Sequence, residues 1–266
     1  MNQPPVASAA PRYTRQVVTH KTAWVNEKLF SLTITRPPGF KFVPGQFARL
    51  GLALDPTAPE TPNEWRAYSM VSAPHDEFLE FFSIVVPGGE FTSELSRLRV
   101  GDSLLVEKMA TGYLTLDRFV DGRDLWLLGS GTGIAPFLSI LQDFEVWQRF
   151  ERIVLVYSAR TCAELAYQAL IEGFAGLEHL AEFADRLIYL PVVTREAQAG
   201  CLNARITALL DSGELERTAG LELTPEHSRV MICGNPQMID DIRQRLKLRG
   251  LNLSLSRRPG QVAVEN

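Results

Sequence analysis

Cysteine and histidine are scarce in this sequence, which has three cysteines and four histidines among 266 residues. Cys162, Cys201 and Cys233 are too far apart for a CxxC or iron–sulfur pattern, and their odd number argues against a disulfide framework. The histidines, at positions 20, 75, 179 and 227, show no metal-ligand spacing. We therefore expect no metal site, and any redox chemistry would depend on an organic cofactor.

Long apolar runs and an excess of positive charge are also lacking. No run is long enough to cross a membrane, and residues 1–11 have neither the basic start nor the apolar segment of a secretory signal. A net charge of −4 gives no general case for nucleic-acid binding. We expect a cytoplasmic monomer that binds neither membranes nor nucleic acid, with a flexible tail at residues 1–13.

What the sequence does contain is typical of a globular protein, with 45% hydrophobic and 22% charged residues in a length suited to two domains. Basic residues gather near the C-terminus, and they have two interpretations: a surface that docks an acidic partner, or a solvated helix face. These residues are Arg243, Arg245, Lys247, Arg249, Arg257 and Arg258.

The first half shows short strands divided by turns. Phe30, Leu32 and Ile34 alternate with polar residues, and the run ends at a Pro-Pro-Gly turn. Further strands are expected at 46–52, 65–71, 78–85 and 103–108, with one short helix beginning near Thr92 and Ser93. Antiparallel strands of this length close into a small barrel, so we predict an antiparallel Greek-key β-barrel over residues 14–119.

After residue 122 apolar runs alternate with helical segments, which predicts βαβ units and a parallel sheet over residues 123–266. The expected strands are 125–128, 152–157, 187–193, 229–233 and 252–255. One helix should follow the first strand, because an apolar stripe continues through five positions at helical spacing. They are Ile134, Phe137, Leu138, Leu141 and Phe144.

A glycine-rich turn, GSGTG at 129–133, follows the first of these strands and precedes that helix. Alternate glycines let the backbone approach an anion, and a helix N-terminus attracts negative charge, so the turn can cradle a pyrophosphate. The turn matches neither G-x-G-x-x-G nor the P-loop, and a tight structural turn is the alternative.

The strand at 229–233 also ends in a turn that leads into a helix. Gly234 follows the strand, Asn235 can cap the helix and Pro236 suits its first position. Ligands of open α/β sheets bind outside the carboxyl ends of the strands, where both turns lie.

Three motifs occur in a characteristic order: RAYS at 66–69, GTGIAP at 131–136 and CGNP at 233–236. From Tyr13 onward the chain resembles the ferredoxin–NADP reductase family, and it looks closest to the bacterial ferredoxin or flavodoxin reductases. The resemblance implies a reductase that transfers hydride from NADPH to FAD and then single electrons to ferredoxin or flavodoxin, reversibly. Its partner would be an acidic electron carrier.

The resemblance assigns the RAYS motif to FAD. Arg66 and Tyr68 project to the same face of a strand, so Arg66 can pair with the phosphates while Tyr68 stacks on the isoalloxazine. Ser69 would form a hydrogen bond near the flavin N5. The other residues implied for FAD are Ala67, Phe82, Ile84, Val85, Phe91, Thr92 and Ser93. Residues 82–85 could instead be barrel core alone, and Thr92 or Ser93 a helix cap.

Three arginines resemble those that meet the ribose 2′-phosphate, and they favour NADP over NAD because a phosphate monoester is best met by guanidinium donors. These are Arg160, Arg195 and Arg205, each placed after a strand or at a helix start. The alternative is three surface arginines. The other residues implied for the nucleotide are Gly131, Thr132, Gly133, Thr194, Gly234, Asn235 and Pro236.

Catalytic roles are implied for Ser69, Cys233 and Glu265. Cys233 would lie against the nicotinamide and shape its pocket, although it can also be read as a small apolar strand residue. Glu265 resembles a family glutamate linked to proton and electron transfer. Family chains usually continue to an aromatic or longer tail, whereas this sequence stops at Asn266, so we expect either missing residues or a more open flavin face.

Other functions remain open at this stage. The reductase component of an oxygenase system has the same two domains, but it often carries a fused iron–sulfur domain, for which the cysteines here do not suffice. A standalone NAD(P)H flavin reductase would bind flavin weakly and need no protein acceptor. A nucleotide-binding sensor without catalytic activity could use the same domains.

Overall fold

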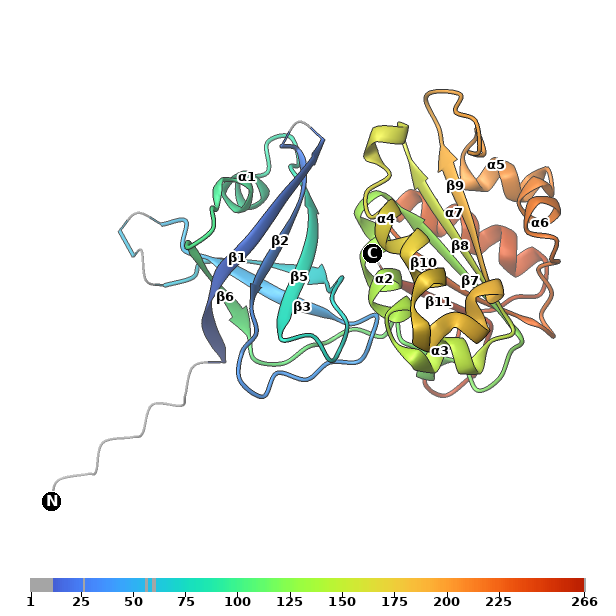
Figure 1. The fold of residues 1–266 in the computed structure, drawn as a ribbon, viewed down its shortest axis with the longest axis horizontal. Helices are drawn as coiled ribbons and strands as arrows, with labels where there is room; N and C mark the ends of the chain where they lie inside the picture. Colours follow the sequence, from blue (N-terminus) through green and yellow to red (C-terminus); the bar gives the residue numbers. More distant parts are fainter. Residues whose placement is uncertain (1–11, 26, 56, 59–60, 266) are drawn as a thin grey trace, which may run out of the picture.

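Two β-sheets organise the chain, an antiparallel sheet in the first half and a parallel sheet in the second (Figure 1). The computed structural model describes residues 12–25, 27–55, 57–58 and 61–265. The first eleven residues of the predicted tail lie outside the described residues, and the first strand begins at Tyr13. Within the described residues no helix is both long enough and apolar enough to span a bilayer.

The antiparallel sheet is a six-stranded barrel with the strand order β4-β3-β6-β1-β2-β5. Its strands are β1 (Tyr13–Val25), β2 (Leu29–Thr35), β3 (Phe47–Leu52), β4 (Glu64–Ser69), β5 (Phe78–Ile84) and β6 (Ser103–Glu107). A bridge between Met70 and Phe81 joins the two edges and closes the barrel. Phe30, Leu32 and Ile34 fill the interior, as their alternation predicts.

Two features of the barrel differ from the prediction. No strand was predicted at 13–25, because only Gln16 and Val18 of β1 are buried and the strand therefore lacks a regular apolar alternation. Helix α1 (Glu90–Arg97) begins earlier than expected, and Gly89 is the residue that precedes it. Neither Thr92 nor Ser93 is therefore the helix cap.

The parallel sheet has the order β11-β10-β7-β8-β9. Its strands are β7 (Asp124–Ser130), β8 (Arg152–Ala159), β9 (Leu187–Val193), β10 (Ser228–Cys233) and β11 (Val262–Glu265). The predicted fifth strand at 252–255 was wrong. A tight turn pairs Leu255 with Arg258 and sends the chain back, and Val262 then pairs with Val230 as the edge strand.

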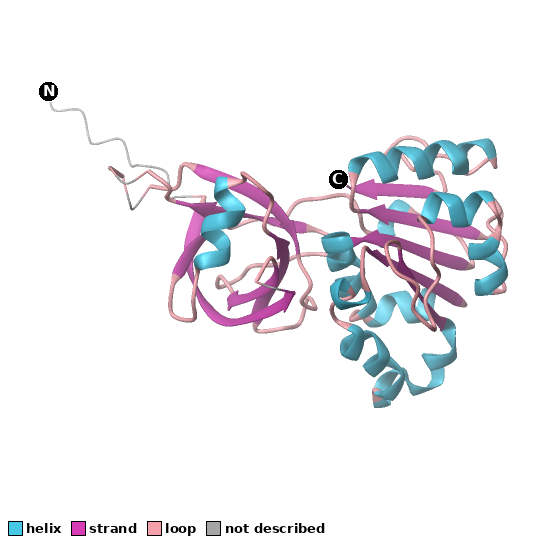
Figure 2. Cartoon of the chain, turned by 90° about the horizontal axis from the view of Figure 1, so that it is seen from above, coloured by secondary structure: helices cyan, strands magenta, loops and turns pink. Residues whose placement is uncertain are grey.

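Helices cover both faces of this sheet (Figure 2). The α-helices are α2 (Ala135–Leu141), α3 (Phe144–Arg149), α4 (Gln168–Gly173), α5 (Ile206–Asp211), α6 (Glu214–Ala219) and α7 (Pro236–Leu248). The 3₁₀ helices are η1 (Leu116–Arg118), η2 (Gly131–Ile134), η3 (Cys162–Glu164), η4 (Phe174–Gly176) and η5 (Glu178–Arg186). The predicted start of α7 is confirmed, since Asn235 Oδ1 accepts from Met238 N and Pro236 occupies the first turn.

The single helix expected after the glycine turn is two helices. Helix α2 ends at Leu141, and the Asp143 side chain accepts a hydrogen bond from Glu145 N (2.9 Å) to start α3. An aspartate in this position favours a new helix N-terminus over continuation. Phe144 therefore leaves the apolar stripe and is partly exposed.

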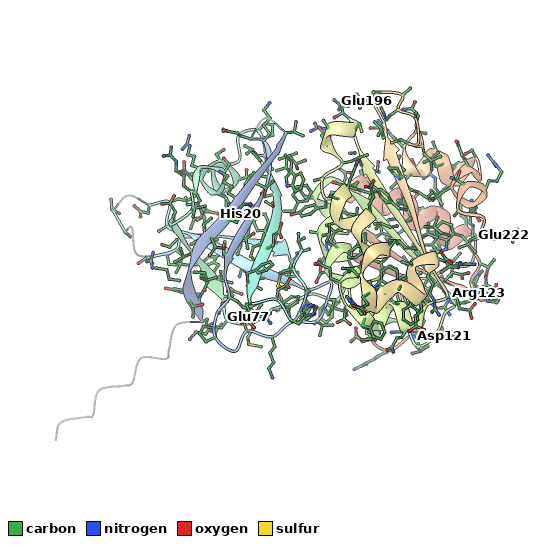
Figure 3. All side chains as sticks on the ribbon, viewed as in Figure 1. His20, Glu77, Asp121, Arg123, Glu196 and Glu222 are labelled. Atoms are coloured by element: carbon green, nitrogen blue, oxygen red, sulfur yellow. The ribbon has the colours of Figure 1, made fainter. Side chains whose placement is uncertain are left out.

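The segment between the two sheets is fixed by charge and by a glycine. Arg229, almost fully buried, donates from Nε to Asp121 Oδ1 (3.0 Å), and Arg123 pairs with the buried Asp124 (2.7 Å). A side chain at Gly122, whose φ is +117°, would collide with the Arg229 side chain. Figure 3 places Asp121 and Arg123 at one end of the α/β domain and Glu196 at the other.

One hydrophobic core continues from the parallel sheet into the barrel. It includes Leu29, Val71 and Phe82 from the barrel together with the buried face of α2. Two hydrogen bonds from α2 cross the same boundary: Ser139 Oγ donates to Ser72 O (2.8 Å), and Gln142 Nε2 donates to Val71 O (2.7 Å). These contacts hold the two domains together beside the carboxyl ends of the parallel strands.

Candidate functional site

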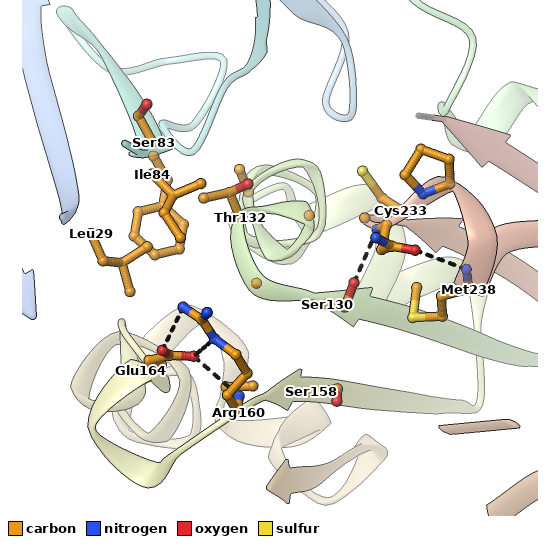
Figure 4. Close-up of a pocket in the computed structure, with 18 of the residues that line it drawn as sticks. Leu29, Ser83, Ile84, Ser130, Thr132, Ser158, Arg160, Glu164, Cys233 and Met238 are labelled. Atoms are coloured by element: carbon orange, nitrogen blue, oxygen red, sulfur yellow. Dashed lines mark hydrogen bonds and ion pairs between the residues drawn. The ribbon is translucent and has the colours of Figure 1, made fainter. Parts of the chain in front are cut away.

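A cavity of about 1060 Å³ lies between the two domains and is lined by residues of both. Figure 4 shows part of it, with Leu29, Ser83 and Ile84 from the barrel facing Thr132, Arg160 and Cys233 from the α/β domain. Most residues singled out from the sequence line it. They are Arg66, Ala67, Tyr68, Ser69, Phe82, Ile84, Thr92, Gly131, Thr132, Gly133, Arg160, Thr194, Arg205, Cys233, Gly234, Asn235 and Pro236.

Tyr68 is held rigidly on the barrel wall. Its ring stacks on Phe91 (centroids 6.2 Å apart, 27° between planes) and meets Phe81 edge to face at 6.5 Å. Ser83 Oγ donates to the Tyr68 hydroxyl (3.3 Å), and burial raises the pKa of Tyr68. A phenol fixed in this way presents a flat apolar face, and its side chain loses little further conformational entropy when a ligand binds.

Arg66 lies beside Tyr68 and keeps its charge accessible. Its side chain is 56% exposed, pairs with Glu64 (2.9 Å) and lies over the Phe91 ring at 5.7 Å. Phe91 does not line the cavity but supports both cavity residues from behind. The guanidinium can exchange its exposed carboxylate for a stronger anion, because such surface pairs are worth little.

The hydroxyls at the start of α1 are turned inward. Thr92 Oγ1 accepts from Val86 N (3.0 Å) and donates to Gly89 O (3.3 Å), while Ser93 Oγ donates to Gly89 O (2.7 Å). Thr92 lines the cavity and Ser93 does not. Both side chains thus stabilise the turn that precedes the helix.

Strand β5 supplies the neighbouring part of the wall. Phe82, Ser83 and Ile84 line the cavity, whereas Val85 does not and its amide donates to Lys28 O (2.8 Å). Phe82 also belongs to the shared core. This strand is therefore both barrel core and cavity wall, so the two interpretations of 82–85 are compatible.

The glycines of the turn at 129–133 serve different purposes. Gly131 has a φ of +54° and open space where a side chain would stand, so its backbone is accessible from the cavity. A Cβ at Gly133 would lie 2.4 Å from Cys233 O, and one at Gly234 would lie 2.2 Å from Ser130 Oγ. The loops that follow the parallel strands β7 and β10 are thus in backbone contact, and Ser130 Oγ accepts from Asn235 N (3.1 Å; Figure 4).

Arg160 and Arg205 line the cavity from the same domain as these two loops. Arg160 forms two contacts with Glu164, from Nε (3.0 Å) and from Nη2 (2.8 Å), which raise its pKa. Arg205 precedes α5 and lines the cavity with Thr194. The Arg195 side chain is not among the lining residues, although its amide donates to Arg160 O (2.9 Å).

Ser69, Cys233 and Glu265 come together at the junction of the domains. Ser69 Oγ donates to Glu265 Oε2 (3.1 Å), and Cys233 pairs with Glu265 in the register of β10 and β11. Burial raises the pKa of Glu265 to about 7, and the hydrogen bond from Ser69 opposes this shift. Burial and the nearby Glu265 raise the pKa of Cys233 to about 12, so its thiol stays neutral.

Sequence reasoning missed several lining residues. Glu164 stands four residues after Arg160, a spacing typical of a helical ion pair, so that partner was detectable. Lys28, Met238 and Asp241 gave no comparable signal, because their positions depend on how distant segments meet.

The chain is similar in sequence to reductases of known name. Residues 127–244 match the model of the oxidoreductase NAD-binding domain family. The chain is 44% identical over 260 residues to ferredoxin–NADP reductase A of Sorangium cellulosum, covering 96% of this chain and 90% of that protein. It is 42% identical over 224 residues to flavodoxin/ferredoxin–NADP reductase of Escherichia coli, covering 84% and 86%.

It is also similar in structure to a ferredoxin NADP+ reductase from Neisseria gonorrhoeae, solved with bound FAD and NADP. The TM-score is 0.88 at 35% identity, and the match covers 97% of this chain and 99% of that one. The likeness therefore includes both domains and their junction.

Proposed function

Since this chain belongs to the ferredoxin/flavodoxin–NADP reductase family, we propose that it transfers hydride from NADPH to a bound FAD and passes single electrons to ferredoxin or flavodoxin, reversibly. The observation that carries the proposal is the cavity between the domains, with Tyr68 and Arg66 on one wall and Gly131 and Arg205 on the other.

The residues present fit both cofactors. The barrel wall offers a rigid aromatic face and an accessible guanidinium, which suit a flavin ring and a pyrophosphate. The opposite wall offers an open glycine backbone and two arginines, which suit a second dinucleotide. We assign FAD to Arg66, Ala67, Tyr68, Phe82, Ile84 and Thr92, with Val85, Phe91 and Ser93 as support. We assign the nucleotide to Thr132, Arg160, Thr194, Arg205 and the loops that follow β7 and β10.

Bound FAD supplies the redox chemistry, since it accepts a hydride and releases electrons one at a time. The chain's residues orient the reactants and exclude water. Tyr68 offers a flat aromatic surface, and Gly133 and Cys233 line the same cavity from the other domain. Ser69 Oγ holds a hydrogen bond to Glu265, whose pKa near 7 allows its carboxyl to give or take a proton at neutral pH. The neutral Cys233 shapes the pocket and is not a nucleophile.

The electron acceptor distinguishes this function from that of a flavin reductase. NADPH-dependent reduction of a cytochrome should require added ferredoxin or flavodoxin. Free flavin should not substitute for that carrier protein. Equal rates with free flavin alone would instead favour a flavin reductase. Turnover with an acidic carrier should fall as salt is raised. Of the basic residues near the C-terminus, Arg243, Arg245 and Arg249 pair with carboxylates of the same chain, so the carrier's charge is tested by salt and not by these residues alone.

The same proposal includes location and assembly. Cys162, Cys201 and Cys233 are unpaired among the described residues, which is typical of a reducing compartment. We propose a cytoplasmic monomer that acts without membrane or nucleic acid. We also propose that residues 14–119 form the FAD domain and residues 123–266 the NADP domain.

Arg205→Ala should separate NADPH from NADH. Loss of a guanidinium that meets the 2′-phosphate removes a charge-assisted hydrogen bond, so KM for NADPH should rise roughly ten- to a hundredfold while KM for NADH changes little. Arg195→Ala is the matched control and should have a smaller effect, since that side chain does not line the cavity. Equal losses with both nucleotides in Arg205→Ala would disprove the assignment.

Glu265 should make the stability of the FAD-free chain depend on pH. Its pKa is raised from 4.5 to about 7, so the folded chain binds this proton more tightly than the unfolded chain. The free energy of unfolding should therefore fall as pH rises from 4.5 to about 7, by on the order of 1–3 kcal/mol relative to Glu265→Gln. Denaturant titrations of both proteins measure this difference, and parallel pH profiles would contradict the assignment.

A further inference from the structure

Tyr167 holds a backbone conformation that bulky residues avoid. Its φ is 62° and its ψ 17°, directly before helix α4. A left-handed conformation at a residue other than glycine costs about 1–3 kcal/mol and persists only where the surrounding structure enforces it. Tyr167 is only 6% exposed, so its side chain is packed against the surrounding structure on almost every side.

Those contacts belong to the other domain. The Tyr167 ring lies 4.8 Å from that of Trp24 on β1 and meets Phe82 on β5 edge to face at 5.2 Å. The hydroxyl donates to Glu80 Oε1 on β5 (2.6 Å). Tyr167 is buried and Glu80 is partly buried, and this burial raises the pKa of both groups. A hydrogen bond in such surroundings competes little with solvent.

The segment that carries Tyr167 begins in the candidate nucleotide site. Arg160 and Glu164 line the cavity and bind one another (Figure 4). Glu164 O accepts from Tyr157 Oη (3.2 Å) and from Ala166 N (2.9 Å), which makes the segment a short, hydrogen-bonded connection.

The other end of the connection also reaches the cavity. Phe82, which Tyr167 contacts, lines the cavity itself, and Ser83 and Ile84 follow it on β5 as further lining residues. Val25, next to Trp24, lines it as well. The residues 160–167 therefore link the wall that faces the nucleotide to the wall that faces the flavin.

We propose that Tyr167 is a positioning residue that fixes strand β5 relative to Arg160 and Glu164. A phosphate bound at Arg160 would then hold the lining residues of β5 in the position that hydride transfer requires. The inference rests on the proposed function, because it takes the two walls to hold FAD and NADPH. Tyr167 acts through Glu80 and Phe82 and touches no reacting atom. Its strained backbone is maintained because the side chain must reach across the domain boundary.

Tyr167→Phe tests this proposal, because it keeps the ring and removes only the hydrogen bond to Glu80. Ser139→Ala is the matched control, since it removes another hydrogen bond between the domains, Ser139 Oγ to Ser72 O. This bond also reaches β5, because Ser72 Oγ accepts from Glu80 N (3.1 Å), but it involves neither Arg160 nor Glu164. The probe is 2′,5′-ADP, which carries the 2′-phosphate but no nicotinamide. Hydrogen exchange of the amides of 78–84 is measured with and without the probe in the purified protein.

In the wild type and in Ser139→Ala, the probe should slow exchange in 78–84 by roughly tenfold, the ratio expected from a hydrogen bond to a charged group. In Tyr167→Phe this protection should disappear while the affinity for 2′,5′-ADP changes less than about twofold. Flavin reduction at saturating NADPH should slow roughly tenfold in Tyr167→Phe with little change in KM. Glu80→Gln, which keeps an acceptor oxygen, should retain most of the protection.

Protection in Tyr167→Phe equal to that of the wild type would overturn the proposal. Its loss in Ser139→Ala to the same extent would also overturn it, since any contact between the domains would then suffice. A fall in 2′,5′-ADP affinity as large as the fall in rate would reduce Tyr167 to a structural support for Arg160. If NADPH fails to reduce the flavin even in the wild type, the proposed function fails, and the exchange measurement still decides the role of Tyr167.

Discussion

Gly133→Ala is expected to abolish most NADPH-driven flavin reduction while FAD stays bound to the barrel. The added Cβ would lie 2.4 Å from Cys233 O, 2.6 Å from Cys233 C and 2.7 Å from Gly234 Cα. All three neighbours are backbone atoms, so no side chain can rotate away and the two loops must separate. Such overpacking costs about 1–3 kcal/mol in stability.

The catalytic loss should exceed the loss of stability. Separation of the loops moves Cys233 and its neighbours, and a displacement of about 1 Å at a reacting centre can cost roughly a hundredfold in rate. Stopped-flow reduction of the bound flavin by NADPH measures this loss. The three atoms nearest to the added Cβ all belong to Cys233 and Gly234 of the α/β domain, so the flavin content of the purified variant should match the wild type.

Gly129→Ala is the control, at the carboxyl end of β7 four residues before Gly133. A Cβ there would meet its nearest neighbours at 3.4 Å, an ordinary contact, and the residue does not line the cavity. We expect a reduction rate within about threefold of the wild type, the effect of a well-tolerated packing change. Equal activity in Gly133→Ala and Gly129→Ala would show that flavin reduction does not require the close contact between Gly133 and Cys233.

Tyr68→Ala should cause the largest loss of FAD. The Tyr68 ring is packed against Phe91 and Phe81, and truncation of such an aromatic typically costs about 3–5 kcal/mol. Part of this cost falls on folding, because Ser83 Oγ loses its acceptor. We still expect the FAD dissociation constant to rise roughly a hundredfold, which equilibrium dialysis or flavin fluorescence can measure.

Tyr68→Phe separates the ring from the hydroxyl. It keeps the stacking surface and removes only the acceptor for Ser83, a neutral hydrogen bond worth about 0.5–1.5 kcal/mol. FAD affinity should therefore fall by no more than about tenfold. If Tyr68→Ala bound FAD as tightly as Tyr68→Phe, the ring would not be the flavin platform.

Local patterns predicted most of the architecture. The alternation of Phe30, Leu32 and Ile34 and the cap at Asn235 with Pro236 depend on neighbours in sequence, and both were recovered. The glycines after β7 and β10 marked the carboxyl ends of two strands that lie side by side in the sheet. These signals sufficed for the two domains and for most of the cavity wall.

Features that depend on distant contacts were missed. The edge strand is 262–265 because Val262 finds Val230 after a turn at 255–258, and nothing local distinguishes it from 252–255. Gly133 looked like a phosphate contact, but the approach of Cys233 gives it a packing role. Tyr167 carried no signal at all, since its partners come from β1 and β5.

The central claim is that FAD and NADPH meet in the cavity between the barrel and the parallel sheet. Anaerobic titration of the purified protein with NADPH, followed by the visible absorbance of the flavin, tests it most directly. The account predicts a yellow protein that binds FAD and loses its colour as NADPH is added, with NADH much less effective. A protein that stays colourless after incubation with excess FAD, or whose bound flavin remains oxidised in the presence of NADPH, would contradict it.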